Sequence, residues 1–400
     1  MERLAKKAER MLTGTILPFW MGLRDDAAGG YYGYMDFDLA VDKTADKGCI
    51  LNSRILWFFS EAALALGRED VALEADHAYD FLTEHCMDGT FGGVYWSVHA
   101  DGSPADTTKH TYNQAFAVYA LSAYSRLCRV RAPARAAQAL AQARALFELI
   151  EARCTDGEGY LEAFTRAWQP ASNEKLSENG VLADKTMNTL LHVFEGWSGL
   201  YAAAPDPAVE KAMRRILAIY AGRVYDPQKH RQNVFFDAHY RSLLDLHSYG
   251  HDIESSWLID WGTRLLGDDA LTAKIAAIDD DLAAEIYRTA YRNHSLCNEC
   301  DRGVVDTTRV WWVQAEAVLG FVNALEKHPA HTEYAAAAAD VWHYIETVLK
   351  DSRPGGEWFW DADENGVPAS RKPIVEPWKC PYHNGRMCLE LMRRDPDVEA

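Results

Sequence analysis

Three of the 14 histidines in this 400-residue chain stand in patterns that suit acid–base chemistry. His192 follows Asp184 and Asn188 at steps of four residues, which places three polar side chains along one face of a helix. An imidazole with its ordinary pKa of about 6.5 takes up or releases a proton near neutral pH. The sequence therefore predicts that this stripe faces a polar site, although a single histidine on an amphipathic helix is more often ordinary packing.

The other two histidines lie near the expected starts of helices. His251, in HSYGHDIESSW, is followed three residues later by Glu254. A carboxylate beside an imidazole orients the ring and raises its basicity. His383, in WKCPYHNGRM, comes two residues after Pro381, which suits the first turn of a helix, and Trp378 stands just outside that turn. Both histidines are candidates for proton transfer, with ordinary packing as the alternative for each.

Arg54 lies in the middle of the apolar run ILNSRILWFF. If that helix face is buried, the guanidinium needs a partner or an anionic ligand, because an unpaired charge is costly inside a protein. Arg54 is therefore a candidate for binding negative charge.

The cysteines give weak grounds for a metal site. Cys297 and Cys300, in LCNEC, have metal-ligand spacing, but no second CxxC or nearby histidine pair completes four ligands. None of the three histidines has a second His or Cys at the spacing that binds a metal. We expect no catalytic metal, while a structural zinc at the CxxC pair and ligands gathered from distant helices stay open as alternatives.

The composition is that of a soluble globular protein, with 48% hydrophobic and 25% charged residues. The net charge of −18 opposes binding to nucleic acid or to an anionic membrane, and a neutral substrate fits better. The first residues lack the apolar core of a signal peptide, and no run of about 18 apolar residues indicates a membrane span. Scattered cysteines suit a reducing compartment. We expect a cytoplasmic protein without disulfides.

A repeat indicates the architecture that positions these residues. Glycine followed by an aromatic-rich extended segment recurs in GGYYGYMDFD, FGGVYWSVHADGSPAD, GYLEAFTRAW, VFFDAHY and GGEWFWDADENGVPAS, at gaps of about 60 to 75 residues with room for a sixth unit at LCNECDRGVVD. Two amphipathic helices fit between successive segments. Several of them carry aromatic and polar side chains on one face, which suits the inner ring of a closed toroid better than an open solenoid. The sequence predicts an all-α (α/α)₆ barrel of twelve helices with short hairpins, forming one domain over residues 1–400.

The segments LNSRILWF, KHTYNQAFAVYALS, LSENG with DKTMNTLLH, HSYGHDIESSWL, TRVWWVQAEA and PWKCPYHNGRM together resemble the N-acylglucosamine 2-epimerase superfamily. The resemblance runs from about residue 15 to the C-terminus and is strongest with members that act on β-linked disaccharides. It implies an (α/α)₆ barrel with one deep pocket and no cofactor. It further implies that His251 and His383 are acid/base groups on opposite faces of the sugar C2, that His192 assists ring opening, and that Arg54 binds the oxygen that gains negative charge. The substrate-binding residues it implies are Tyr112, Asn188, Glu254, Trp311, Trp312 and Trp378.

Inversion of C2 requires removal of a proton next to the aldehyde and its return to the other face, so two imidazoles and a cation suit the reaction. We expect a monomer. From the resemblance we further expect it to take a small disaccharide, such as cellobiose or lactose, and to convert the glucose at its reducing end into mannose by inversion of C2. An aldose–ketose isomerase of the same superfamily is the nearest alternative. A glycoside hydrolase using Glu254 and Glu316, or a noncatalytic sugar-binding protein, are weaker alternatives.

Overall fold

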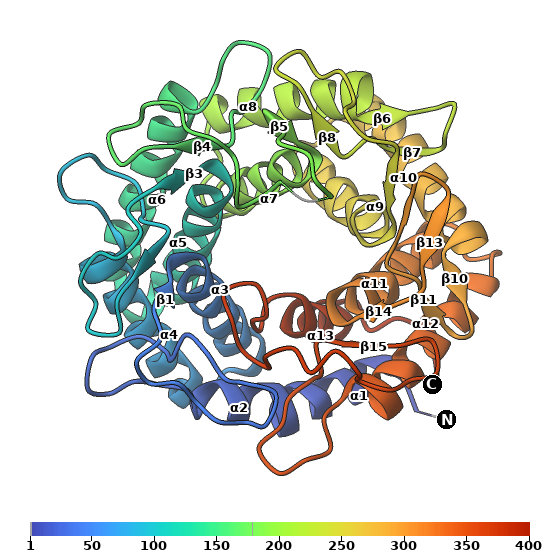
Figure 1. The fold of residues 1–400 in the computed structure, drawn as a ribbon, viewed down its shortest axis with the longest axis horizontal. Helices are drawn as coiled ribbons and strands as arrows, with labels where there is room; N and C mark the ends of the chain where they lie inside the picture. Colours follow the sequence, from blue (N-terminus) through green and yellow to red (C-terminus); the bar gives the residue numbers. More distant parts are fainter. Residues whose placement is uncertain (1, 178) are drawn as a thin grey trace.

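The computed structural model describes residues 2–177 and 179–400 and consists of helices in two concentric rings, which Figure 1 shows along their common axis. The inner ring contains α3 (Cys49–Leu66), α5 (Thr111–Arg131), α7 (Met187–Ala203), α9 (Tyr249–Arg264), α11 (Trp311–Lys327) and α13 (His383–Arg394). The outer ring contains α1 (Leu4–Met11) with α2 (Leu17–Met21), α4 (Glu69–Phe81), α6 (Pro133–Arg153), α8 (Pro207–Ile219), α10 (Asp269–Thr289) and α12 (Glu333–Tyr344). The predicted (α/α)₆ barrel is confirmed.

The inner helices are buried on most sides, whereas the outer helices bury one stripe. Fifteen of the 18 residues of α3 are buried. In α8 the buried residues include Val209, Ala212, Met213 and Ile216, whose spacing of three and four residues makes one apolar face. Consecutive inner helices pack against one another from α3 round to α13, and α13 contacts α3, so the ring closes.

One helix of the described chain, α3, is long and apolar enough to cross a membrane. Of that helix, 83% is buried inside the protein. Such burial is typical of a core helix.

The first outer position is divided between two helices, because a π-helical turn at Leu12–Ile16 separates α1 from α2. This turn contains Gly14, a poor helix former, and Pro18 lies at the start of α2. Similar π turns follow α4, α8 and α12 at Leu82–Cys86, Tyr220–Val224 and Ile345–Leu349. The two short helices fill one place, so the ring keeps its twelve positions.

Short antiparallel strands link each unit of the ring to the next. Strand β1 (Lys47–Gly48), just before α3, pairs with β2 (Ser97–Val98) in the following unit. The same link recurs in β3–β4 (Lys109–His110 with Ala163–Phe164), β5–β8 (Lys185–Thr186 with Phe235–Phe236), β9–β12 (Leu246–Ser248 with Glu299–Asp301) and β14–β15 (Arg309–Val310 with Asp361–Ala362). Strand β13 (Val304–Asp306) extends the β12 pair, and β6–β7 (Tyr225–Asp226, Arg231–Gln232) and β10–β11 (Tyr291–Arg292, Ser295–Leu296) are local hairpins.

Five of the six predicted extended segments therefore contain paired strands. The segment near residue 30 forms only single bridges, and one of these, between Met35 and Val375, joins the first unit to the last. The strands thus hold the N-terminal ends of the inner helices side by side around the ring.

Buried lysines form ion pairs just before four of the inner helices. Each lies just before an inner helix, is no more than 1% exposed, and pairs with a carboxylate from the preceding loop: Lys47–Asp25 (2.7 Å), Lys109–Asp88 (3.2 Å), Lys185–Asp156 (2.5 Å) and Lys379–Glu357 (2.6 Å). Removing one partner of such a pair leaves a buried charge, typically at a cost of about 3–5 kcal/mol. The repeated pair therefore stabilises the start of four of the six inner helices, α3, α5, α7 and α13.

Candidate active site

A cavity of about 290 Å³ lies at the end of the inner ring where the helices begin. Its walls include all ten site residues predicted from the sequence: Arg54, Tyr112, Asn188, His192, His251, Glu254, Trp311, Trp312, Trp378 and His383. Lining residues that were not predicted are Leu176, Ser248, Asn298, Glu299, Val310, Trp360 and Lys372. Leu176 opens the LSENG segment, whose Glu178 lies outside the described residues.

The cavity side chains come from the first two turns of the inner helices. Asn188 and Trp312 are the second residues of α7 and α11. One turn deeper, four residues on, lie His192 and Glu316. Because residues four apart share one helix face, the site consists of an upper layer near the mouth and a deeper layer below it.

His383 is held by a carboxylate. Its Nδ1 lies 2.7 Å from Oε1 of Glu316, and its ring centroid lies 5.3 Å from that of Trp312. Burial, together with the positive charges of Arg386 and Arg54, lowers the pKa of His383 well below its usual range. Its Nε2 is bonded to no described residue and is left to face the cavity.

His251 also contacts Trp312, at 4.9 Å between ring centroids. Its Nδ1 lies 2.7 Å from the hydroxyl oxygen of Ser248. Burial, aided by the nearby His192, lowers the pKa of His251 to about 3. Both imidazoles thus contact one tryptophan and face one cavity.

His192 occupies the deeper layer. Its Nδ1 lies 2.9 Å from Oε2 of Glu195, its Nε2 lies 4.0 Å from Oε2 of Glu254, and its ring packs edge-on against Tyr112 at 5.0 Å. Burial lowers its pKa, although Glu195 opposes the shift. All three histidines are therefore held through Nδ1.

Three buried glutamates from α7, α9 and α11 surround one arginine of α13. The guanidinium of Arg386 donates to Glu195 at 2.5 Å, to Glu316 at 2.8 Å, and also to Glu254 and the Tyr382 hydroxyl. The second oxygen of Glu254 has no hydrogen-bond partner among the described residues. Burial and the charge of Glu316 raise the pKa of Glu254. This cluster forms the floor beneath the histidines.

Glu195 and Arg386 were not predicted from the sequence as site residues. Glu195 stands three residues after His192, the same spacing by which Glu254 was connected to His251. That spacing could have identified Glu195 from the sequence. Arg386 stands three residues after His383 but binds glutamates that lie 70 to 191 residues away in the sequence, which spacing cannot reveal.

Glu254, Glu316 and His383 lie close enough together to hold a metal ion. The Arg386 guanidinium, however, already bonds to both of these carboxylates. The chain itself therefore already supplies a cation to these carboxylates. The Cys297–Cys300 pair belongs to no set of three or more close ligands within residues 2–177 and 179–400.

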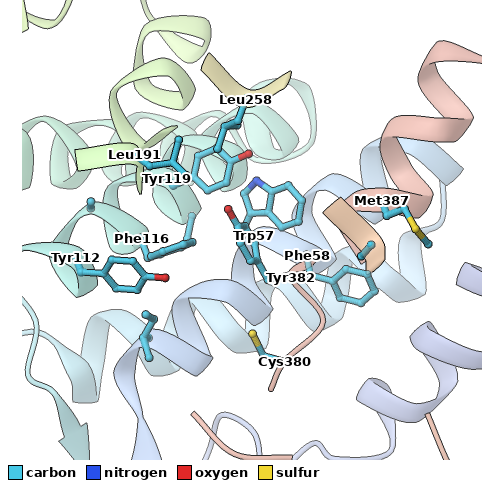
Figure 2. Packing of buried hydrophobic residues seen from close by; sticks show 14 of the residues in the cluster. Trp57, Phe58, Tyr112, Phe116, Tyr119, Leu191, Leu258, Cys380, Tyr382 and Met387 are labelled. Atoms are coloured by element: carbon cyan, nitrogen blue, oxygen red, sulfur yellow. The ribbon is translucent and has the colours of Figure 1, made fainter. Parts of the chain in front are cut away.

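Arg54 is 2% exposed and forms no ion pair with a carboxylate in the described part of the chain. Its guanidinium donates to the Tyr112 hydroxyl at 2.7 Å and contacts Cys380 Sγ at 3.8 Å. The charge also lies over the rings of Phe116 at 4.2 Å and Tyr382 at 4.7 Å. Figure 2 shows these aromatic residues and Cys380 packed together. A buried, uncompensated cation beside a cavity is suited to an anion or to negative charge that develops during a reaction.

The tryptophans form the apolar walls. Trp378 contacts Tyr112 with ring centroids 5.9 Å apart, and Trp312 contacts both catalytic candidates as described. Trp311 is only 1% exposed and lies under the ammonium of Lys379 at 4.7 Å, so it contributes mainly to packing. Aromatic faces beside polar groups match the alternating C–H and O–H surfaces of a sugar.

The chain matches the model of the N-acylglucosamine 2-epimerase (GlcNAc 2-epimerase) family over residues 30–384. A cellobiose 2-epimerase of Eubacterium cellulosolvens is 48% identical over 405 residues, covering 97% of this chain and 98% of that protein. The crystal structure of a sugar epimerase from a ruminal bacterium superposes with a TM-score of 0.95 at 45% identity, covering 99% and 100% of the two chains. A D-mannose isomerase structure has a TM-score of 0.82 at 17% identity over 97% and 98% of the chains, which shows a shared fold alone.

Proposed function

Because this chain belongs to the N-acylglucosamine 2-epimerase family and is a carbohydrate epimerase, we propose that it interconverts glucose and mannose at the reducing end of β-1,4-linked disaccharides. Its reactions are cellobiose to glucosyl-mannose and lactose to epilactose. The observation that carries the proposal is the pair His251 and His383, which face one cavity with Nε2 unbonded to any described residue, beside the uncompensated charge of Arg54. The similarity to a cellobiose 2-epimerase supports the choice of disaccharide.

The reaction begins with opening of the pyranose ring, in which His192 moves a proton between the ring oxygen and the C1 hydroxyl. One of the pair His251 and His383 then takes the proton from C2. The electron pair of the broken C–H bond forms a C1–C2 double bond, and the carbonyl oxygen gains negative charge, giving a cis-enediolate. The other histidine, which enters this step as the imidazolium, gives its Nε2 proton to the opposite face of C2, the C1 carbonyl forms again, and ring closure completes the inversion.

Arg54 stabilises the enediolate oxygen, because its charge is buried and has no carboxylate partner. Loss of a donor that acts on such an oxyanion typically costs about 2.7–4 kcal/mol of barrier. The N-termini of the inner helices also point toward this end of the ring, and helix N-termini favour negative charge. Both features stabilise the intermediate more than the neutral sugar.

The proposal includes no cofactor and no macromolecular partner. We further propose that the protein acts as a monomer. The net charge of −18 suits a neutral sugar and opposes binding to nucleic acid or an anionic membrane, and a cytoplasmic location agrees with the eight free cysteines.

The test is incubation of purified, chelator-treated protein with cellobiose or lactose in D₂O, followed by NMR of the products. We expect a mannose-ended disaccharide with deuterium at C2. A ketose as the main product would instead identify an aldose–ketose isomerase, and free glucose would identify hydrolysis through Glu254 and Glu316. Recovery of unchanged sugar without deuterium would refute the proposal.

A further inference from the structure

Ser248 is the N-cap residue of α9, the helix that carries His251, yet its side chain makes no capping hydrogen bond. Serine at this position ordinarily accepts a hydrogen bond from a backbone N–H of the first turn, which stabilises the helix. Thr186 performs that role at the corresponding place in α7, where its hydroxyl accepts from the N–H of Thr189 at 3.0 Å. Helix α9 therefore lacks this stabilising hydrogen bond.

The Ser248 hydroxyl instead contacts Nδ1 of His251 at 2.7 Å. Ser248 is 7% exposed and lines the cavity, and its backbone is fixed by pairing of β9 with Glu299 of β12. The hydroxyl is therefore held rigidly behind the imidazole, on the side away from Nε2.

The partner of His251 differs from the partners of the other two histidines. His383 and His192 bond to carboxylates, Glu316 and Glu195, through Nδ1. A carboxylate only accepts hydrogen bonds and favours a positively charged ring, whereas a hydroxyl carries no charge and fixes orientation without adding a counter-ion. The two histidines proposed to face C2 are thus supported by groups of different chemistry.

We propose that Ser248 is a positioning residue for His251: its hydroxyl accepts a hydrogen bond from Nδ1–H, which leaves the lone pair of Nε2 directed at the C2 proton. This inference rests on the proposed function. Without the hydroxyl, the ring rotates more freely and its other neutral tautomer, with the proton on Nε2, is no longer disfavoured. Proton transfer at the His251 face then slows, while transfer at the His383 face does not.

A two-base mechanism makes this effect measurable in D₂O. When His383 forms the enediolate, it holds the C2 proton until that proton exchanges with D₂O. After the exchange, the enediolate either returns to the starting sugar with deuterium from His383, or becomes the epimer with deuterium from His251. The ratio of labelled starting sugar to labelled epimer reports the relative rates of the two histidines. When the reaction starts from the other epimer, His251 forms the enediolate. The ratio of labelled starting sugar to labelled epimer then compares protonation by His251 with protonation by His383.

The experiment measures this ratio for wild type, Ser248→Ala and Ser248→Thr, starting from cellobiose and separately from glucosyl-mannose. For Ser248→Ala we expect the ratio to rise about 10-fold from one epimer and to fall about 10-fold from the other, as expected for loss of one hydrogen bond to a general base. Ser248→Thr, which keeps the hydroxyl, should restore both ratios. The melting temperature of Ser248→Ala should fall only slightly, because the bond to His251 is lost but no capping bond is, and Ser248→Thr should recover it.

Asp206→Ala is the matched control, since Asp206 caps the outer helix α8 by accepting from the N–H of Ala208 at 2.8 Å. This variant should lower the melting temperature and leave the ratios unchanged. If Ser248→Ala lowers the melting temperature and leaves both ratios at the wild-type value, Ser248 is an ordinary cap and the inference is wrong. If wild-type protein incorporates no deuterium at all, the proposed function fails, and this inference fails with it.

Discussion

Replacing Arg54 with methionine should reduce catalysis strongly and leave the fold as stable as before. Methionine keeps the length and the apolar stem of the side chain but removes the charge. The perturbation is informative because Arg54 combines 2% exposure with the lack of a carboxylate partner among the described residues. Most buried arginines would give the opposite result for stability.

The magnitudes follow from the contacts. The guanidinium donates to the Tyr112 hydroxyl at 2.7 Å and to the weak acceptor Cys380 Sγ at 3.8 Å, and it lies over Phe116 at 4.2 Å. Contacts of a desolvated cation with aromatic rings are worth about 2 kcal/mol, whereas taking an ion out of water costs several kcal/mol. We therefore expect the free energy of unfolding of Arg54→Met to equal or exceed that of wild type. The turnover number should fall about 10²–10³-fold, the usual effect of losing an oxyanion donor.

The assay combines urea unfolding, followed by circular dichroism, with the rate of epimer formation from cellobiose. Arg126→Met serves as the control, because Arg126 pairs with Glu61 at 2.8 Å and does not line the cavity. It should leave turnover unchanged. A loss of more than about 2 kcal/mol of stability in Arg54→Met, or turnover within a factor of about three of wild type, would refute the reasoning that Arg54 is a cation held ready for negative charge.

Three further predictions address the rest of the site. His251→Ala and His383→Ala should each abolish epimerisation without altering the circular dichroism spectrum, and near wild-type turnover in either variant would contradict the two-base mechanism. Glu254 has a pKa raised to about 8 by burial and by Glu316. A carboxyl whose folded pKa exceeds its unfolded value of about 4.5 contributes stability at low pH that is lost as the pH rises through the folded pKa. Wild type should therefore lose stability relative to Glu254→Gln between pH 4.5 and 8, and parallel unfolding curves across that range would contradict the raised pKa. Exhaustive chelation should leave activity unchanged, because Arg386 already neutralises the carboxylates that could bind a metal, and loss of activity restored by a divalent ion would reverse this assignment.

The fold was predictable because its signals are periodic. Apolar residues at helical spacing, and glycine with aromatic residues once per unit, recur often enough to indicate paired helices and their number. The break at Leu12–Ile16 was not predicted, because MERLAKKAERML continues a helical pattern into it and a π turn leaves no periodic mark.

The candidate site was predictable as far as its side chains stand in local patterns or in the segments that resemble the family. The floor was not. Glu195 and Arg386 are charged residues on helices, which sequence reasoning assigns by default to solvent, and their burial depends on partners from distant helices. The role of Ser248 depends on where a hydroxyl points, and a serine before a helix predicts a cap rather than a contact with histidine.

The arginine on the last inner helix has a consequence for the order in which the ring is assembled. Glu195, Glu254 and Glu316 belong to helices that emerge earlier during synthesis, and before α13 docks their three negative charges have no Arg386 to offset them. Like charges without a counter-ion resist burial, so the centre of the barrel stays hydrated and loosely packed until α13 arrives. His383 lies on that same helix. The step that completes the core therefore also delivers a proposed catalytic base, and we expect a partly folded chain to have no competent site with which to bind sugar.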